Sequence, residues 1–205
     1  LKLPDEVRLS CQLDAGQKMH VRRVIHDEID QKLLQKSNSA EERNLAILFS
    51  DIRSFTSFSE RHLPYDIVHI LNRYFLACGG AIVRNSGRID KYMGDGIMAI
   101  FGLEGEGHPA KLAYQAALDM LEELETFNGY LRSTFGEEFQ IGVGIHYGPV
   151  VVGDLGHPDM TSFTAIGDTV NVAARVESAT KGKANILVSQ QVYDVLDEAD
   201  WTSYD

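Results

Sequence analysis

The chain has 205 residues, 44% of them hydrophobic, which is enough to bury one good core. Its formal net charge of −11 argues against nucleic acid or an anionic membrane surface as a partner. Two cysteines form no disulfide framework, and no signal peptide or apolar run of about 18 residues stands out, so we expect no membrane span in the chain. These features favour a cytoplasmic location, or the cytoplasmic face of a membrane if the full-length protein has spans upstream.

Residues 1–36 are predicted to form an amphipathic helix, because apolar residues recur at spacings of four among charged ones. This helix either packs on the domain that follows or is a signalling helix that pairs with its copy in a dimer. The first residue is Leu rather than Met, which suggests a fragment with a sensor domain upstream. Residues 37–44 are predicted to be a polar linker, and residues 45–205 one folded domain.

The first predicted strand is Leu45–Phe49, an apolar run followed directly by polar residues and Asp51. Asp51 is either the N-cap of the next helix or a ligand for a divalent cation. His62-Leu63-Pro64 breaks the chain, and a long helix is predicted to follow. Its apolar face belongs to the core, and it ends at Asn85-Ser86-Gly87.

A β-hairpin is predicted over Arg88–Phe101, with its turn at Gly94-Asp95-Gly96. Asp95 is either ordinary turn chemistry or a second cation ligand. If Asp51 and Asp95 converge about 4 Å apart, they repel by about 4 kcal/mol at an effective dielectric constant of about 20. Such a pair favours a cation between its oxygens, and oxygen ligands suit Mg²⁺ or Mn²⁺ rather than Zn²⁺.

The second half of the chain alternates further strands and helices. A helix is predicted over Lys111–Arg132, then a hairpin of Phe139–His146 and Val150–Asp154 that turns at Gly148-Pro149. A helix over Thr169–Ser178 places Asn171 and Arg175 on one face. A strand at Ala184–Val188 and a short helix at Gln190–Leu196 complete the predicted elements.

Four ordered motifs now carry a resemblance to a known family. FSDIRSFT, GRIDKYMGDGIMAIFG, VGIHYGPVVVGDLG and FTAIGDTVNVAARVE together resemble the catalytic domain of class III nucleotidyl cyclases, the adenylyl and guanylyl cyclases. The resemblance extends from about Leu45 to about Leu196. Any one motif would be weak, whereas four in this order are highly specific.

The resemblance implies an α+β fold with a ferredoxin-like βαββαβ core, antiparallel hairpins and helices on one face. It implies conversion of ATP to 3′,5′-cyclic AMP and pyrophosphate with two Mg²⁺ or Mn²⁺ ions per site. Asp51, Ile52 and Asp95 would hold the metals, while Asn171 would orient the ribose and Arg175 would stabilise charge on the α-phosphate. The triphosphate would lie on residues Ile52, Arg53, Ser54, Phe55 and Thr56.

The base would be recognised by Lys91 and Thr164. In adenylyl cyclases a Lys at the first position donates to adenine, whereas guanylyl cyclases tend to carry Glu there. Thr164 stands where many relatives have Asp, and its hydroxyl can still accept from the adenine amino group. This Thr is typical of the branch that includes bicarbonate-responsive cyclases, so bicarbonate control is a hypothesis resting on that one residue.

The family builds each site between two protomers, so the resemblance implies a homodimer. Asp51 and Asp95 would come from one protomer, and Lys91, Thr164, Asn171 and Arg175 from the other. Gly142 departs from the pattern, because some relatives have a phosphate-binding Arg there, and Lys183 is a weak substitute. The C-terminal hairpin usual in the family is missing, so the end of the domain is expected to be truncated or unordered. A guanylyl cyclase and a catalytically inactive regulatory domain are the alternatives.

Overall fold

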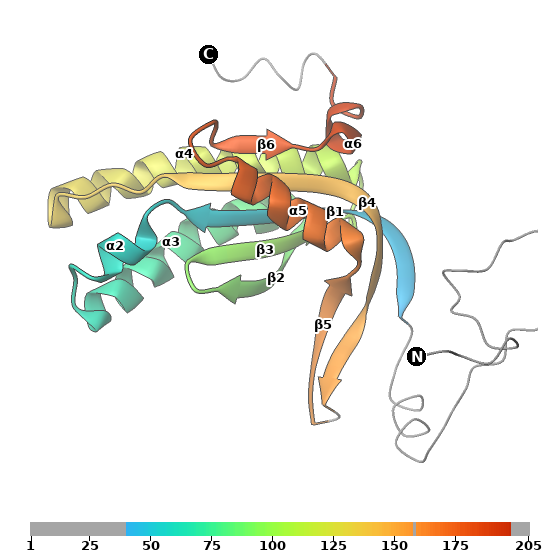
Figure 1. The fold of residues 1–205 in the computed structure, drawn as a ribbon, viewed down its shortest axis with the longest axis horizontal. Helices are drawn as coiled ribbons and strands as arrows, with labels where there is room; N and C mark the ends of the chain where they lie inside the picture. Colours follow the sequence, from blue (N-terminus) through green and yellow to red (C-terminus); the bar gives the residue numbers. More distant parts are fainter. Residues whose placement is uncertain (1–39, 158, 198–205) are drawn as a thin grey trace, which may run out of the picture. The chain divides into compact units, whose positions relative to one another are not determined.

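The computed structural model describes residues 40–157 and 159–197 (Figure 1). Its elements follow in this order: β1 (Glu41–Ile52), α2 (Phe55–Ser59), α3 (Pro64–Arg84), β2 (Gly87–Met93), β3 (Gly96–Phe101), α4 (Pro109–Phe135), β4 (Ile141–His157), β5 (Met160–Ile166), α5 (Asp168–Ala179), β6 (Ile186–Val188) and α6 (Gln190–Tyr193). The helix predicted over 1–36, residues 37–39 of the predicted linker and residues 198–205 at the end of the domain lie outside the described residues.

One mixed sheet organises these elements, with strand order β2-β3-β1-β4-β5. All neighbours along that path are antiparallel, and the short β6 pairs in parallel with β4. Strand β1 pairs with β4 through twelve positions, from Glu41 opposite Val152 to Ile52 opposite Ile141. The α+β class and the order of the βαββαβ core are therefore confirmed.

The linker prediction was wrong for residues 41–44, which belong to β1. They lie opposite residues 149–152 of β4, so their main-chain groups are taken up by the sheet. Their polar side chains match the exposure of this end of the strand, because Glu41 and Glu42 are both exposed. Polarity alone did not distinguish an exposed strand end from a linker.

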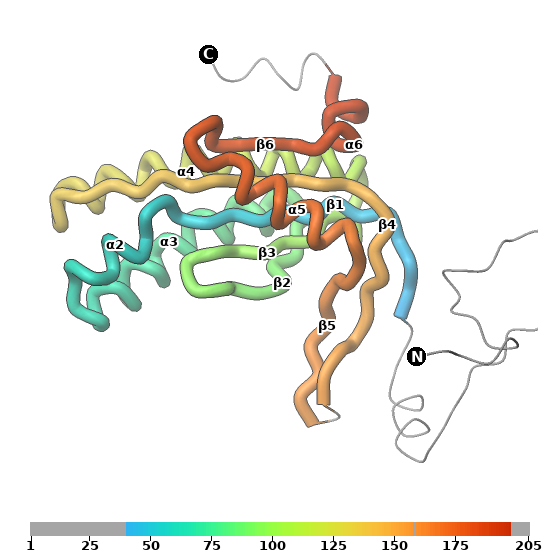
Figure 2. The backbone as a smooth tube through the Cα atoms, in the orientation of Figure 1, coloured from blue at the N-terminus to red at the C-terminus, as the bar shows by residue number. Residues whose placement is uncertain are grey.

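The turn predicted at Gly148-Pro149 was also wrong, because β4 runs through both residues without reversing. Gly148 lies opposite Leu45 and Pro149 opposite Asn44, and the Thr169 hydroxyl donates to the Pro149 carbonyl at 2.6 Å. Figure 2 shows β4 curving from the sheet into a long arm that it forms with β5. The hairpin therefore consists of β4 and β5, with Thr164 on its second strand.

Two apolar cores explain why β1 and β3 are apolar on both faces. Ala46 and Leu48 face α3 and α4, whereas Leu45 and Ile47 face the opposite side, where Ala173 of α5 covers them. The expectation of helices on one face was thus wrong for α5. Its close approach depends on a glycine in β4: a Cβ on Gly144 would lie 2.0 Å from the main-chain nitrogen of Glu177.

Helix α3 is the one described helix whose length and hydropathy would suit a membrane span. Its apolar face is nevertheless buried: Ile70, Tyr74 and Cys78 are fully enclosed in the core with α4 and the sheet. A core helix passes the same composition test, and the packing of α3 accounts for its hydropathy.

Candidate functional site

Two carboxylates meet at the end of the central strands. Asp51 is the penultimate residue of β1, and Asp95 lies in the turn that joins β2 to β3. The side chains share a hydrogen bond, and the main-chain N–H of Ile52 donates to Asp95 Oδ2 at 3.2 Å. A left-handed Gly94, with φ of 65°, provides the turn that brings Asp95 back toward β1. The predicted convergence of the two carboxylates is confirmed.

The electrostatics of this pair favour a cation. The pKa of Asp95 is raised from 3.8 to about 6, first by burial and then by the charge of Asp51 and their shared hydrogen bond. Main-chain N–H groups, including that of Ile52, oppose the shift. A divalent cation bound between the carboxylates would remove the repulsion, and their hard oxygen donors suit Mg²⁺ or Mn²⁺.

The affinity for Mn²⁺ is expected to be about tenfold weaker at pH 5 than at neutral pH, because the Asp95 proton must leave before the oxygen can coordinate. In the metal-free protein the folded state holds this proton between about pH 4 and about pH 6, where the unfolded state has lost it. Stability without metal should therefore fall, and Mn²⁺ affinity should rise, as the pH increases through this window. Calorimetric titration with Mn²⁺ at about pH 5 and about pH 7.5 measures the affinity, and denaturant unfolding of the metal-free protein at the same two pH values measures the stability. A pH-independent affinity would contradict the expectation.

A cavity of about 460 Å³ opens beside the carboxylates. Its lining consists of these residues: Asp51, Ile52, Arg53, Ser54, Phe55, Thr56, Asp95, Lys181 and Gly182. All five residues predicted to cradle the triphosphate, Ile52 among them, therefore line one cavity with the two carboxylates predicted to bind metal. Ser54, with φ of 56°, is left-handed and turns the chain from β1 into α2. The cavity thus combines anionic oxygens with two basic residues.

Arg53 occupies the space that Gly142 leaves open. A Cβ on Gly142 would lie 1.7 Å from Arg53 Nη2, so Arg53 in this position leaves no room for a side chain at 142. The guanidinium pairs with Glu177 at 3.4 Å and donates to the Thr180 hydroxyl. Burial, followed by the charge of Asp51, raises the pKa of Glu177, while Arg53 lowers it.

Lys181 is the basic residue that sequence reasoning missed. It lies just beyond α5 and lines the cavity, whereas the weak candidate Lys183 does not. The Lys183 main-chain N–H instead donates to the Thr180 carbonyl at 3.0 Å in the same loop. The two lysines flank Gly182, and the sequence carried no signal to choose between them.

Lys91 and Thr164 come together from distant parts of the chain. Lys91 Nζ, on β2, donates to Thr164 Oγ1, on β5, at 3.2 Å. Asp90, which sequence reasoning had not singled out, contacts both: its Oδ2 accepts from Thr164 Oγ1 at 2.9 Å and lies 3.1 Å from Lys91 Nζ. The structure thus brings the two predicted base-recognition residues together, but neither lines the carboxylate cavity.

Asn171 and Arg175 are exposed on one face of α5, as predicted from their spacing. Neither side chain makes a hydrogen bond or ion pair with another residue in the described ranges. Neither lines the carboxylate cavity, although Glu177 and Lys181, farther along the same segment, lie beside it. Within one chain the predicted site residues therefore form three separate groups. These are the residues that line the carboxylate cavity, the Lys91–Thr164 pair, and Asn171 with Arg175.

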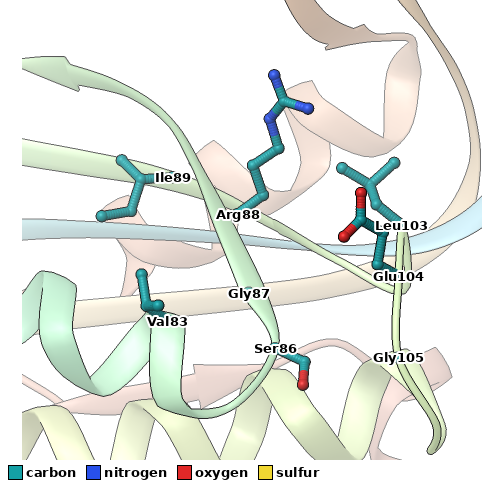
Figure 3. Close-up of a pocket in the computed structure, with 8 residues that line it drawn as sticks. All are labelled: Val83, Ser86, Gly87, Arg88, Ile89, Leu103, Glu104 and Gly105. Carbon is teal, nitrogen blue, oxygen red and sulfur yellow. The ribbon is translucent and has the colours of Figure 1, made fainter.

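A second cavity, of about 530 Å³, lies where α3 joins β2 (Figure 3). Its lining consists of these residues: Val83, Ser86, Gly87, Arg88, Ile89, Leu103, Glu104 and Gly105. Arg88 is also stacked on the ring of Phe163 in β5, with its Cζ 4.4 Å from the ring centroid. None of the predicted site residues lines this cavity, so its size does not make it the candidate site.

Comparison with known proteins places this geometry in a family. Residues 37–204 match the adenylate and guanylate cyclase catalytic domain. An adenylate cyclase from Anabaena cylindrica is 41% identical over 159 residues, which are 75% of this chain and 31% of that protein. The chain therefore spans about a third of the length of this curated relative.

Solved structures agree with the sequence match. The guanylyl cyclase Cya2 superimposes with a TM-score of 0.73 at 32% identity, covering 78% of this chain and 81% of that one. The adenylyl cyclase CyaB from P. aeruginosa gives a TM-score of 0.73 at 29% identity, covering 77% and 82%. The motifs, the fold and these matches agree, and the chain belongs to the class III nucleotidyl cyclase catalytic domains.

Proposed function

We propose that the chain is an adenylyl cyclase domain that converts ATP into 3′,5′-cyclic AMP and pyrophosphate. The observation that carries the choice of base is the contact between Lys91 Nζ and Thr164 Oγ1 at 3.2 Å. Adenine presents a ring-nitrogen acceptor beside an amino donor, whereas guanine presents a ring N–H beside a carbonyl. A Lys donor next to a Thr acceptor therefore suits adenine. The related Anabaena cylindrica protein, named adenylate cyclase, supports the same choice.

Asp51, Asp95 and the main chain of Ile52 would hold two Mg²⁺ or Mn²⁺ ions. The donor set fits, because the carboxylates converge and Asp95 is already destabilised as an anion without a cation. When bound, the ions would make the ribose 3′-hydroxyl more acidic and neutralise charge on the triphosphate. Arg53 and Lys181 add fixed positive charge to the same cavity, which a chain of net charge −11 requires in order to bind a polyanion.

The reaction forms one bond and breaks another at the α-phosphorus. The 3′-oxygen attacks in line, the bond from phosphorus to the β-phosphate oxygen breaks, and pyrophosphate leaves while the hydroxyl proton passes to water. Asn171 would hold the ribose for this attack, and Arg175 would donate to the α-phosphate as its charge grows. A comparable donor contributes about 3–4 kcal/mol to transition-state stabilisation in other enzymes.

A homodimer would bring the separate groups of residues together. Asn171 and Arg175 are exposed in one chain, so a second copy can present them to the carboxylate cavity. The β4–β5 arm and the β2–β3 hairpin also expose large apolar side chains, among them Leu155, Met160, Tyr92 and Met93. Such side chains are typical of surfaces that a partner covers. Two equivalent sites would then form around a two-fold axis.

Purified protein with Mn²⁺ is expected to form cyclic AMP from ATP at least tenfold faster than cyclic GMP from GTP, because Lys91 and Thr164 mismatch the guanine edge. Chromatography of the products measures both rates. A preference for GTP would favour a guanylyl cyclase, and no product from either nucleotide would favour a regulatory domain.

In the same assay at fixed pH, bicarbonate is expected to raise the rate of cyclic AMP formation. An unchanged rate would contradict the hypothesis of bicarbonate control.

A further inference from the structure

Asp90 is the buried partner of the Lys91–Thr164 pair. Its side chain has 0% exposure, although it lies beside a lysine whose side chain is 45% exposed. One carboxylate oxygen, Oδ2, takes both contacts, with Thr164 Oγ1 at 2.9 Å and Lys91 Nζ at 3.1 Å. The other oxygen, Oδ1, is buried without a hydrogen-bond partner in the part of the chain that the structure describes. The carboxylate therefore retains an unused acceptor.

A β-bulge explains how Asp90 reaches this place. Ile89 lies opposite Ala99, but Lys91 lies opposite Met98, so Asp90 is an extra residue in β2. In a regular strand Asp90 and Lys91 would point to opposite faces. With the bulge, both side chains contact Thr164. Bulges re-aim side chains at functional sites, and burying an acceptor such as Oδ1 without a partner destabilises the fold, which calls for a reason.

The hydrogen bonds determine what the Thr164 hydroxyl can do. A hydroxyl has one proton to donate and two lone pairs that accept, whereas an ionised carboxylate only accepts. Asp90 accepts the hydrogen bond that the Thr164 hydroxyl donates, and Lys91 donates to one lone pair of Thr164. Thr164 is left with a single free function, which is to accept. Without Asp90 the hydroxyl could rotate and donate instead.

We propose that Asp90 determines the base specificity of this domain by fixing Thr164 as an acceptor beside the Lys91 donor. The pair then matches adenine, and guanine would place a donor against Lys91 and a carbonyl against Thr164. Asp90 acts through Thr164 and is a positioning residue. The inference rests on the proposed function only in that Lys91 and Thr164 face the purine.

Asp90→Asn tests the proposal, because the amide has the same shape but can donate to Thr164 and turn its hydroxyl around. Initial rates with ATP and GTP give kcat/KM for each nucleotide. The ratio of the two values is expected to fall at least about tenfold, mainly through a higher KM for ATP. Glu106→Gln, at an exposed loop residue, removes the same charge and should leave the ratio unchanged. An unchanged ratio in folded Asp90→Asn would overturn the proposal.

A double-mutant cycle separates this role from a loss of folding. Thr164→Val removes the acceptor itself, so adding Asp90→Asn to it should lower the ratio no further. Additive effects would show that Asp90 does not act through Thr164. Thermal unfolding of each variant reports whether the fold is retained.

Equilibrium binding distinguishes a failure of this inference from a failure of the proposed function. Displacement of a fluorescent ATP analogue by ATP and by GTP gives a ratio of Kd values that needs no turnover. If the wild type prefers ATP but makes no cyclic AMP, the proposed activity fails, and the Kd ratio of Asp90→Asn still decides the role of Asp90. If the wild type binds both nucleotides equally, Asp90 sets no specificity and the inference is overturned.

Discussion

Asp51→Asn is expected to lower the rate of cyclic AMP formation by at least about three orders of magnitude, or about 4 kcal/mol in activation free energy. The change removes one of the two carboxylates that would hold the metal ions, but it keeps the size of the side chain. It also removes a charge that raises the pKa of Asp95, so Asp95 should become easier to ionise. Product formation with saturating Mn²⁺ and ATP measures the effect.

The stability of this variant distinguishes a lost metal ligand from a lost fold. Without metal, Asp51→Asn relieves repulsion with Asp95 and should melt at the same temperature as the wild type or higher. Added Mn²⁺ should raise the melting temperature of the wild type more than that of the variant. Glu106→Gln is the matched control, since it removes one exposed negative charge. Wild-type activity in Asp51→Asn would show that Asp51 is not a metal ligand in catalysis.

An equal mixture of Asp51→Asn and Arg175→Ala is expected to recover about a quarter of wild-type activity, although each variant alone is nearly inactive. If protomers exchange freely, half of the dimers carry one copy of each variant. In such a dimer one site receives both substitutions and the other receives neither. Because half of the dimers have one intact site out of two, one quarter of all sites are intact. The rate after exchange, with each variant alone as reference, measures the recovery.

A second mixture provides the control for shared sites. Asp51 and Asp95 line the same cavity in one chain, so mixing Asp51→Asn with Asp95→Asn creates no intact site and should recover nothing. Differently tagged copies show whether mixed dimers have formed. If mixed dimers of Asp51→Asn and Arg175→Ala form but stay inactive, each chain builds its site alone.

Local patterns predicted the order of the core elements and offered the meeting of Asp51 with Asp95 as one of two alternatives, which the motif resemblance then favoured. Each carboxylate follows a strong local signal: an apolar strand before Asp51 and a glycine turn around Asp95. Once β1 and β3 belong to one sheet, their pairing brings the end of β1 next to the start of β3, with Ser50 opposite Ile97. The sequence therefore contained the information needed for this half of the site.

Features that depend on distant partners could not be predicted in the same way. Gly148-Pro149 has the composition of a turn, but pairing with β1 and the hydrogen bond from Thr169 keep it extended. The bulge at Asp90 depends on how β2 pairs with β3, and its role depends on contact with β5. In both places tertiary contacts overrode the local signal.

Arg53 and Gly142 show a further limit of reading positions one at a time. Gly142 alone suggested a missing anchor for the phosphates. In the structure the Arg53 guanidinium lies over Gly142, so the two residues are explained only as a pair. Arg53 had been assigned to the phosphate loop from its motif, but its contacts with Glu177 and Thr180 were not predictable from that motif.

The continuous strand β4 makes each copy internally stiff. It pairs with β1 at twelve positions and extends into the arm, so the carboxylate cavity and the Lys91–Thr164 pair are attached to one hydrogen-bonded frame. Packed and fully paired sheets resist gradual deformation. In the proposed homodimer we therefore expect switching signals to alter the angle between the two copies rather than the shape of either copy. A small molecule that binds between the two copies could then inhibit the enzyme without resembling a nucleotide.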